Sequence, residues 1–341
     1  MVRRGFWAAI AVGLAATIPA RAGEDRPAPL RRWSFAEPHM GTEFRVLFYS
    51  PDEAAATRAS RLAFARIAEL DAALSDYRPD SELMRLCDRA GGPPVPVGPD
   101  LFAVLARSEE FYHRSDGALD ITIGPAVRLW RRARRDRKMP DPDLLRKALD
   151  LVGGDTIRLD PTARTAQLTR PGTRLDLGAI AKGYASGEAI AVLKREGIDR
   201  ALVAGSGDIV VSGPPPGQDG WTISVASLSP VESDATGPTI QLRDAAVSTS
   251  GDAEQFVEID GVRYSHVVDP RTGLGLTERR SVTVIAPDGT TADALDTAAC
   301  ILGPGRGMAL VESTPGASAL FLRIGPDGVE RTTSKGWPSN P

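Results

Sequence analysis

The chain has 341 residues, of which 42% are hydrophobic and 25% charged, and its formal net charge is −3. This is a globular composition with enough length to bury a large core, as one domain or as two fused halves. A mildly acidic charge gives no support for nucleic-acid binding. The two cysteines, Cys87 and Cys300, are too few for a disulfide framework, so one bridge or two buried free thiols are expected.

The first 22 residues predict an export signal. Arg3 and Arg4 precede an apolar run at 6–18, and "ARA" at 20–22 supplies a small-x-small cleavage site. These are the parts of a secretory signal peptide, and the apolar run is too short to span a bilayer comfortably. The basic start fits a twin-arginine signal or an ordinary Sec signal. We therefore expect a periplasmic protein whose signal peptide is residues 1–22.

The first half of the mature chain is predicted to be mostly helical, after a polar entry segment at 23–39 and a strand at 40–50. Near-helical spacing of apolar residues predicts a helix over 52–74. Its buried positions are expected to be Leu62, Ile67, Leu70 and Leu74. A further helix over 101–114 would begin after Asp100 as its N-cap and end at the "SDG" that follows.

Seven basic residues surround one aspartate at 128–138. Such a run is typical of a solvated helix face, and it also fits a docking patch for an acidic partner or for the membrane surface. The sequence leaves both interpretations open.

The second half of the chain reads mainly as strands and hairpins. Short strands with intervening turns are predicted from 156 to 177, a helix at 179–195, and further strands up to 213. Asp260 and Gly261 supply the two-residue turn of a predicted hairpin. The strand at 281–286 then leads into a helix at 290–303. Hairpins and long helices without regular βαβ alternation favour an α+β fold, and 331–341 is expected to be a flexible tail.

Three clusters suggest a chemical role. The segment 115–125 places two acids and two glycines around a predicted apolar strand, and 175–187 places Lys182 at the start of a helix. A lysine at a helix N-terminus suits an anionic ligand, although the segment also fits a plain strand–turn–helix junction. It is not a P-loop, since the glycine spacing is absent. His266 ends a strand just before the turn "DPRTG", where a histidine can be structural or catalytic.

The helix at 290–303 carries the most specific pattern. Asp293, Asp296 and Thr297 stand at i, i+3 and i+4, so they share one face of the helix. Helix capping accounts for Asp293 but less well for the other two residues. Carboxylate and hydroxyl oxygens are the ligands that Mg²⁺ prefers. The residues thus suggest a Mg²⁺-supported reaction on a phosphate ester, without naming the ester.

Taken in order, seven motifs make the chain resemble the FAD:protein FMN transferases, the ApbE-type flavin transferases. They are "MGTEF", "LSDYRPDSEL", "SDGALDITIGP", "LDLGAIAKGYA", "STSGD", "HVVDPRTG" and "ADALDT", spanning about 40–303. The resemblance implies an ApbE-like fold related to paired T-fold halves, with antiparallel sheets and packed helices, in a domain over 40–330. It implies FAD as donor and Mg²⁺ as cofactor. FMN would move to a threonine or serine hydroxyl of a partner protein through a phosphoester bond, releasing AMP.

The resemblance also assigns roles residue by residue. The residues that match the family's FAD contacts are Met40, Tyr77, Ala118, Leu119, Asp120, Asp176, Lys182 and, through nearby backbone, Val267. Those that match its metal ligands are Asp293, Asp296, Thr297 and the Ala179 region, through its carbonyl. His266 matches the position suspected of helping to remove the acceptor's proton, and with Asp296 it forms the expected catalytic pair.

Two positions depart from the family pattern. Ser206 stands within "GSGD" where paired glycines are usual, and Ala253 follows "TSGD" where an aromatic residue is common. Both concern flavin or acceptor preference more than the metal helix. The expected partner is the flavoprotein domain of a membrane redox complex or a respiratory regulator, with at most peripheral membrane contact. Two alternatives are an FAD pyrophosphatase that yields FMN and AMP, and a non-catalytic flavin-binding protein of the periplasm.

Overall fold

The computed structural model describes residues 29–228, 236–251 and 256–338. The predicted signal peptide and Ala253 lie outside these residues. Within them, no helix combines the length and the apolar character that a bilayer crossing needs. The helices and the antiparallel sheets confirm the α+β prediction.

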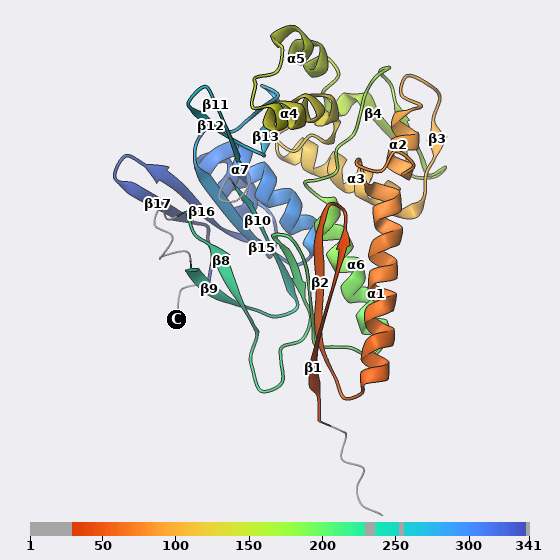
Figure 1. Cartoon of the computed structure of the whole chain (residues 1–341), viewed down its shortest axis with the longest axis vertical. Coiled ribbons are helices and arrows are strands. Elements are labelled where there is room, and N and C mark those ends of the chain that lie inside the picture. Colours follow the sequence, from red (N-terminus) through yellow and green to blue (C-terminus); the bar gives the residue numbers. More distant parts are fainter. Residues whose placement is uncertain (1–28, 229–235, 252–255, 339–341) are drawn as a thin grey trace, which may run out of the picture.

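An eight-stranded antiparallel sheet forms the centre of the molecule, with strand order β1-β2-β6-β7-β10-β15-β16-β17 (Figure 1). Its strands are β1 (Arg31–His39), β2 (Thr42–Ser50), β6 (Ala201–Gly205), β7 (Asp208–Val211), β10 (Ala245–Gly251), β15 (Arg280–Ala286), β16 (Ser318–Gly325) and β17 (Gly328–Thr333). The smaller strands are β3 (Val95–Pro96), β4 (Ile157–Asp160), β5 (Thr165–Leu168), β8 (Trp221–Ala226), β9 (Thr236–Leu242), β11 (Phe256–Ile259), β12 (Val262–Ser265), β13 (Val268–Asp269) and β14 (Leu274–Gly275).

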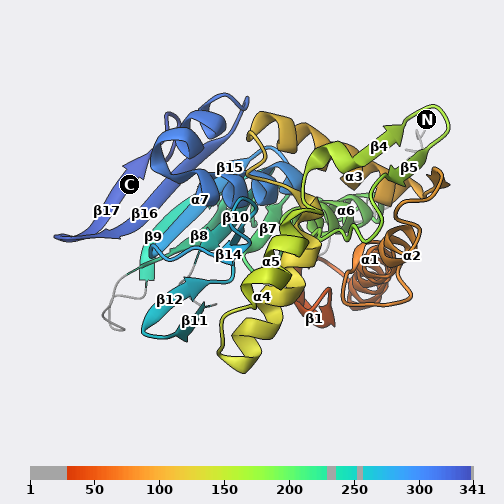
Figure 2. The same ribbon diagram turned by 90° about the horizontal axis from the view of Figure 1, so that it is seen from above.

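Three long helices pack together beside this sheet and share its main core. They are α1 (Glu53–Leu74), α6 (Ala181–Arg195) and α7 (Gly289–Glu312), and α7 lies directly against β10 and β15. The other helices are α2 (Glu82–Cys87), α3 (Pro99–Arg114), α4 (Gly124–Asp136) and α5 (Pro142–Leu149), with short 3₁₀ turns at Ile121–Ile123 and Gly154–Thr156. A separate apolar cluster joins α4 and α5 to the β11–β12 hairpin at one end of the molecule (Figure 2).

The two predicted segments outside the domain contribute strands. The N-terminal entry segment contains β1, which pairs with β2 along nine residues, from Arg31 opposite Ser50 to His39 opposite Thr42. At the other end, β17 runs to Thr333, past the predicted boundary at 330, and Trp337 beyond it is buried. Both are edge strands, which bury only part of their surface, so their mixed polar and apolar residues do not give a clear strand pattern in the sequence.

Several local predictions were wrong in detail. Leu62 is 42% exposed, because the buried stripe of α1 runs through Ala59, Ala63 and Ile67 at four-residue spacing instead. Gly98, not Asp100, is the N-cap of α3. The Asp100 carboxylate instead accepts hydrogen bonds from Arg66 and from the Tyr184 hydroxyl, which joins three helices.

The predicted strands within 115–125 and 174–177 do not form. Residues 121–123 make a 3₁₀ turn, capped by Asp120, whose Oδ1 accepts the Thr122 amide at 2.8 Å. The segment 174–177 is irregular but buried at Leu175 and Leu177. In contrast, the hairpin turn is confirmed, since Asp260 and Gly261 both have positive φ. Cys87 and Cys300 are both buried and are not joined in a disulfide.

The helix predicted at 290–303 is the first part of α7. It begins at Gly289, with Asp288 as its N-cap, and keeps a regular helical course until Gly303, whose φ of 79° and following Pro304 interrupt it. The three residues predicted to share a face therefore all lie in one uninterrupted stretch of helix. This stretch enters the centre of the molecule beside β10.

Candidate active site

A cavity of about 700 Å³ opens where the ends of β7 and β10 meet the first turns of α6 and α7. Its wall includes all thirteen site residues predicted from the sequence. These are Met40, Tyr77, Ala118, Leu119, Asp120, Asp176, Ala179, Lys182, His266, Val267, Asp293, Asp296 and Thr297. The fold therefore brings together segments that lie more than 250 residues apart in the chain.

Two glycines allow the helices α6 and α7 to meet at the floor of this cavity. A Cβ added to Gly183 would lie 2.1 Å from the Gly289 carbonyl oxygen, and one added to Gly289 would lie 2.3 Å from the Gly183 oxygen. Only glycine fits at either position. The close approach lets the Gly183 amide donate a hydrogen bond of 2.9 Å to the Asp293 carboxylate. The N-terminus of α6 thereby helps to hold a buried negative charge.

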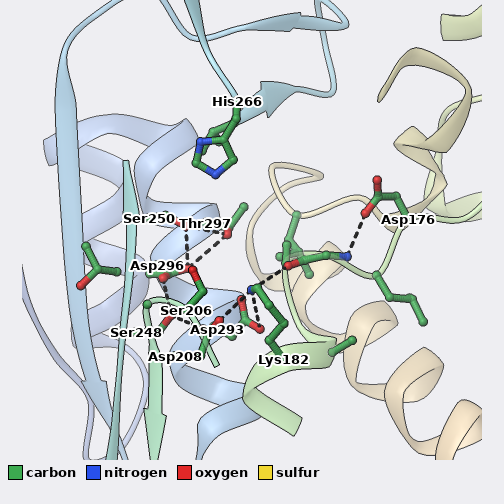
Figure 3. A pocket seen from close by; sticks show the side chains of 18 of the residues that line it. Asp176, Lys182, Ser206, Asp208, Ser248, Ser250, His266, Asp293, Asp296 and Thr297 are labelled. Carbon is green, nitrogen blue, oxygen red and sulfur yellow. Dashed lines mark hydrogen bonds and ion pairs between the residues drawn. The ribbon is translucent and has the colours of Figure 1, made fainter. Parts of the chain in front are cut away.

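Three carboxylates gather around one ammonium group (Figure 3). Lys182 Nζ lies 2.7 Å from Asp208 Oδ2 and 3.8 Å from Asp293 Oδ2. Asp296 is the third carboxylate, and it accepts a hydrogen bond of 2.6 Å from the Ser248 hydroxyl. All three aspartates are almost fully buried. The cluster thus carries more negative than positive charge in a place that water reaches poorly.

The contacts of the Ser248 hydroxyl reflect this excess of negative charge. This group lies 2.6 Å from Asp296 Oδ2 and 2.5 Å from Asp208 Oδ1, although a hydroxyl has only one proton to donate. Whichever of these two carboxylate oxygens does not receive the Ser248 proton needs another proton or a nearby cation. Consistently, burial, reinforced by Asp208, raises the pKa of Asp293 to about 7. Burial, together with Asp293, raises the pKa of Asp296 well above its usual range.

The donor set at this point fits a hard divalent cation. Asp296 and Thr297 are joined through Ser250, whose hydroxyl lies 3.1 Å from Asp296 Oδ1 and 3.0 Å from Thr297 Oγ1. Across the described ranges, no three His, Cys, Asp or Glu side chains form a ready-made metal cage. Mg²⁺ is usually held by one or two carboxylates together with substrate phosphates, so a partial set of oxygen ligands is the expected form.

His266 follows the last residue of β12 and points into the cavity on the side of Thr297 (Figure 3). The backbone on either side of it is held firmly. The buried Trp130 indole of α4 donates to the Ser265 carbonyl at 3.2 Å, and the Val267 amide donates to the Ser265 hydroxyl at 3.1 Å. The Val267 carbonyl already accepts the Leu276 amide at 3.0 Å. The histidine is therefore presented from a rigid turn.

The opposite end of the cavity has a different character, with Met40, Tyr77 and residues 118–120 in its wall. The Tyr77 side chain is exposed, and the Arg131 guanidinium lies over its ring at 4.3 Å from the centroid. Burial raises the pKa of Asp120, whose carboxylate is bonded within its own turn to Thr122. This end offers a flat aromatic surface, in contrast to the acidic end beneath His266.

The sequence reasoning missed several residues of the site, among them Asp76, Arg131, Arg134, Asp208, Ser248 and Ser250. Asp208 and Ser248 stood inside the quoted motifs "GSGD" and "STSGD", so a signal was available for them. Arg131 was hidden in the basic run at 128–138. It is turned into the cavity, while Arg132, Arg135 and Lys138 are exposed.

Ser206, which departs from the family pattern, has an unusual backbone conformation. This residue lines the cavity with a φ of 62°, in the left-handed region that favours glycine. Serine adopts the conformation that a glycine would take more easily.

Comparisons with known proteins show the family of the chain. The sequence profile of the ApbE family matches residues 40–321. An FAD:protein FMN transferase of Treponema pallidum (strain Nichols) is 36% identical over 314 residues, covering 86% of this chain and 85% of the relative. A protein of the same name from Escherichia coli (strain K12) is 32% identical over 275 residues, covering 78% and 77%.

Solved structures give the same result. The flavin transferase ApbE from Vibrio cholerae superposes with a TM-score of 0.82 at 30% identity, covering 90% of this chain and 98% of that one. The apo flavinyl transferase ApbE of Pseudomonas stutzeri superposes with a TM-score of 0.79, also at 30% identity, covering 90% and 95%.

Proposed function

Because the chain belongs to the ApbE family of FAD:protein FMN transferases, we propose that it transfers FMN from FAD to a threonine or serine hydroxyl of a partner protein, with Mg²⁺ and with release of AMP. The observation that carries this proposal is the buried group of three carboxylates around Lys182, with one hydroxyl proton between two of them. Such a cluster can bind a divalent cation together with the phosphates that the cation coordinates.

Each end of the cavity would take a different part of FAD. The flavin ring would lie against Tyr77 and Met40, and the pyrophosphate would lie near Lys182 and the first turn of α6. Asp293, Asp296, Thr297 and the Ala179 carbonyl would hold the Mg²⁺. When bound there, Mg²⁺ supplies charge neutralisation at the phosphates and at the leaving group.

The chemical step needs a base, a nucleophile and a stabilised leaving group. The acceptor oxygen forms a bond to the phosphorus of the FMN half, while the bond from that phosphorus to the bridging oxygen breaks and AMP departs with it. His266 takes the proton of the acceptor hydroxyl, since a neutral imidazole is suited to this near pH 7. Lys182 offsets negative charge on the phosphates as the bond breaks. Holding both reactants in the cavity supplies much of the remaining acceleration.

The test combines the purified protein with FAD, Mg²⁺ and a flavoprotein domain that carries a flavinylation site. We expect covalent fluorescent flavin on the acceptor, a mass gain equal to FMN and one AMP per label. Asp296→Asn should abolish labelling, whereas Asp327→Asn, the same change at an exposed turn, should not. An unlabelled acceptor, with a known family member active in parallel, would reject the proposal.

The two alternative functions give different products. A pyrophosphatase would release FMN and AMP from FAD at the full rate without an acceptor, because water would take the place of the hydroxyl. A non-catalytic flavin-binding protein would bind FAD and release no AMP. Product analysis with and without the acceptor separates all three.

We also propose that the protein is exported to the periplasm and serves a flavoprotein domain of a membrane redox complex or of a respiratory regulator. The support is the signal-like sequence at 1–22. Cell fractionation and sequencing of the mature N-terminus test it, with Gly23 as the expected first residue. A full-length protein that stays in the cytoplasm would contradict export.

A further inference from the structure

A single side chain of α4 connects three parts of the cavity wall. Arg131 donates hydrogen bonds to Asp76, in the loop after α1, and to Asp176, in the loop before α6, the latter at 2.8 Å. Its guanidinium also covers one side of the Tyr77 ring at 4.3 Å from the centroid. Two loops that lie 100 residues apart are thus fastened to the same helix.

The arrangement depends on the shape of the guanidinium. Its planar fork can bond one carboxylate at each edge while its face stacks on an aromatic ring. Without that cation, Asp76 and Asp176 would face each other as two partly buried negative charges. Burial, together with the charge of Asp176, already raises the pKa of Asp76 to about 6 even with Arg131 present.

The residue next to Arg131 anchors this part of α4. The neighbouring Trp130 is buried, and its indole is bonded to the Ser265 carbonyl next to His266. Arg131 therefore reaches into the cavity from a helix that cannot easily shift. Tyr77, in contrast, sits in a loop and is 66% exposed, and the Arg131 guanidinium packs on one face of its ring.

We propose that Arg131 is a positioning residue, which orients the Tyr77 ring and braces the two loops so that the cavity receives the flavin ring of FAD. The inference rests on the proposed function, in which FAD occupies this cavity with its flavin at the Tyr77 end. It also gives Asp176 a structural role, as a partner of Arg131, in place of direct contact with FAD. Both of its oxygens are engaged, one by Arg131 and the other by the Gly178 amide at 2.8 Å.

The experiment compares Arg131→Gln and Arg131→Lys with Arg132→Gln, which removes the same charge from an exposed neighbouring position of α4. Three quantities are measured, namely the Kd for FAD, the fluorescence of the bound flavin at saturation, and KM and kcat for acceptor labelling. Arg131→Gln should raise Kd and KM for FAD about 3- to 30-fold, the range of a cation–π contact of this kind. The kcat should change little, because Arg131 does not touch His266 or the acidic cluster.

The fluorescence and the lysine variant test orientation more directly. A ring stacked on tyrosine is quenched, so the bound flavin should be brighter in Arg131→Gln than in the unaltered protein. Arg131→Lys should lose most of the affinity as well, because an ammonium group cannot bond both carboxylates and stack on the ring. Arg132→Gln should stay within about twofold of the unaltered protein in every measurement.

A double variant separates positioning from general support of the fold. In a Tyr77→Ala background, Arg131→Gln should add less than about twofold to the Kd, since the ring that it positions is gone. The same additional loss with and without Tyr77 would overturn the inference, as would identical values for Arg131→Gln and Arg132→Gln. Absence of FAD binding by the unaltered protein would overturn the proposed function and this inference together.

Discussion

Replacing Lys182 by methionine should destabilise the protein through the charges that it leaves behind. The ammonium lies 2.7 Å from Asp208, and only about a quarter of the Lys182 side chain is exposed. At an effective dielectric constant of about 20 the attraction is about 6 kcal/mol, part of which is offset by the desolvation of both groups. Breaking a buried pair usually costs about 3–5 kcal/mol, and the partial exposure places this one near about 3 kcal/mol.

The free energy of unfolding would be measured by urea denaturation at pH 7.5 with chelator present. Lys194→Met, at an exposed position of the same helix, is the matched control and should stay within about 0.5 kcal/mol of the unaltered protein. Adding Asp208→Asn to Lys182→Met removes one uncompensated charge, so the double variant should regain at least about 1 kcal/mol. If Lys182→Met is as stable as its control, or if the double variant is the less stable one, the charge argument is wrong.

Three further changes test other parts of the structure. Gly183→Ala should lower the free energy of unfolding by at least about 1–3 kcal/mol, because its Cβ would lie 2.1 Å from the Gly289 oxygen. Gly187→Ala in the same helix is the control: its Cβ meets nothing within 4 Å, so it should raise the free energy of unfolding by up to about 1 kcal/mol. Urea denaturation measures both values. The pKa of Asp76 is raised above its unfolded value, so its charge destabilises the fold above pH 6 and this cost is relieved as pH falls from 6 towards 4. Relative to Asp76→Asn, the unaltered protein should therefore gain about 1–3 kcal/mol between pH 8 and pH 4, and equal pH profiles would refute this. His266→Gln should lower kcat for labelling at least about 100-fold while the Kd for FAD stays nearly constant, and a normal kcat would remove this residue from the proton transfer.

Local patterns predicted the elements whose residues carry their own signal. The apolar spacing of α1 and the spacing of Asp293, Asp296 and Thr297 on α7 are properties of single helices, and both are confirmed as helical. The hairpin turn at Asp260 is likewise decided by two adjacent residues. In contrast, the edge strand β1 depends on its pairing with β2, which a sequence pattern does not contain.

The site itself divides in the same way. The resemblance named thirteen residues that the fold does bring to one cavity, but it did not indicate the contact between Asp208 and Ser248, although both residues stand inside quoted motifs. That contact requires β7 to lie next to β10, so that Asp208 and Ser248 share the hydroxyl proton. Arg131 illustrates the opposite error, since a run of seven basic residues looks uniform until the helix turns some of them, Arg131 and Arg134, towards the cavity.

The acidic cluster is better explained by binding than by stability. A fold selected for stability alone would place few unbalanced charges among buried residues, because each costs several kcal/mol when it lacks a partner. Here Lys182, the Gly183 amide and the Ser248 hydroxyl compensate the three carboxylates only in part. The remaining negative charge weakens the empty protein and strengthens its attraction for a cation that arrives with phosphate. Asp296→Asn should therefore abolish metal-dependent labelling, while urea denaturation of the ligand-free variant should show a stability equal to or greater than that of the unaltered protein.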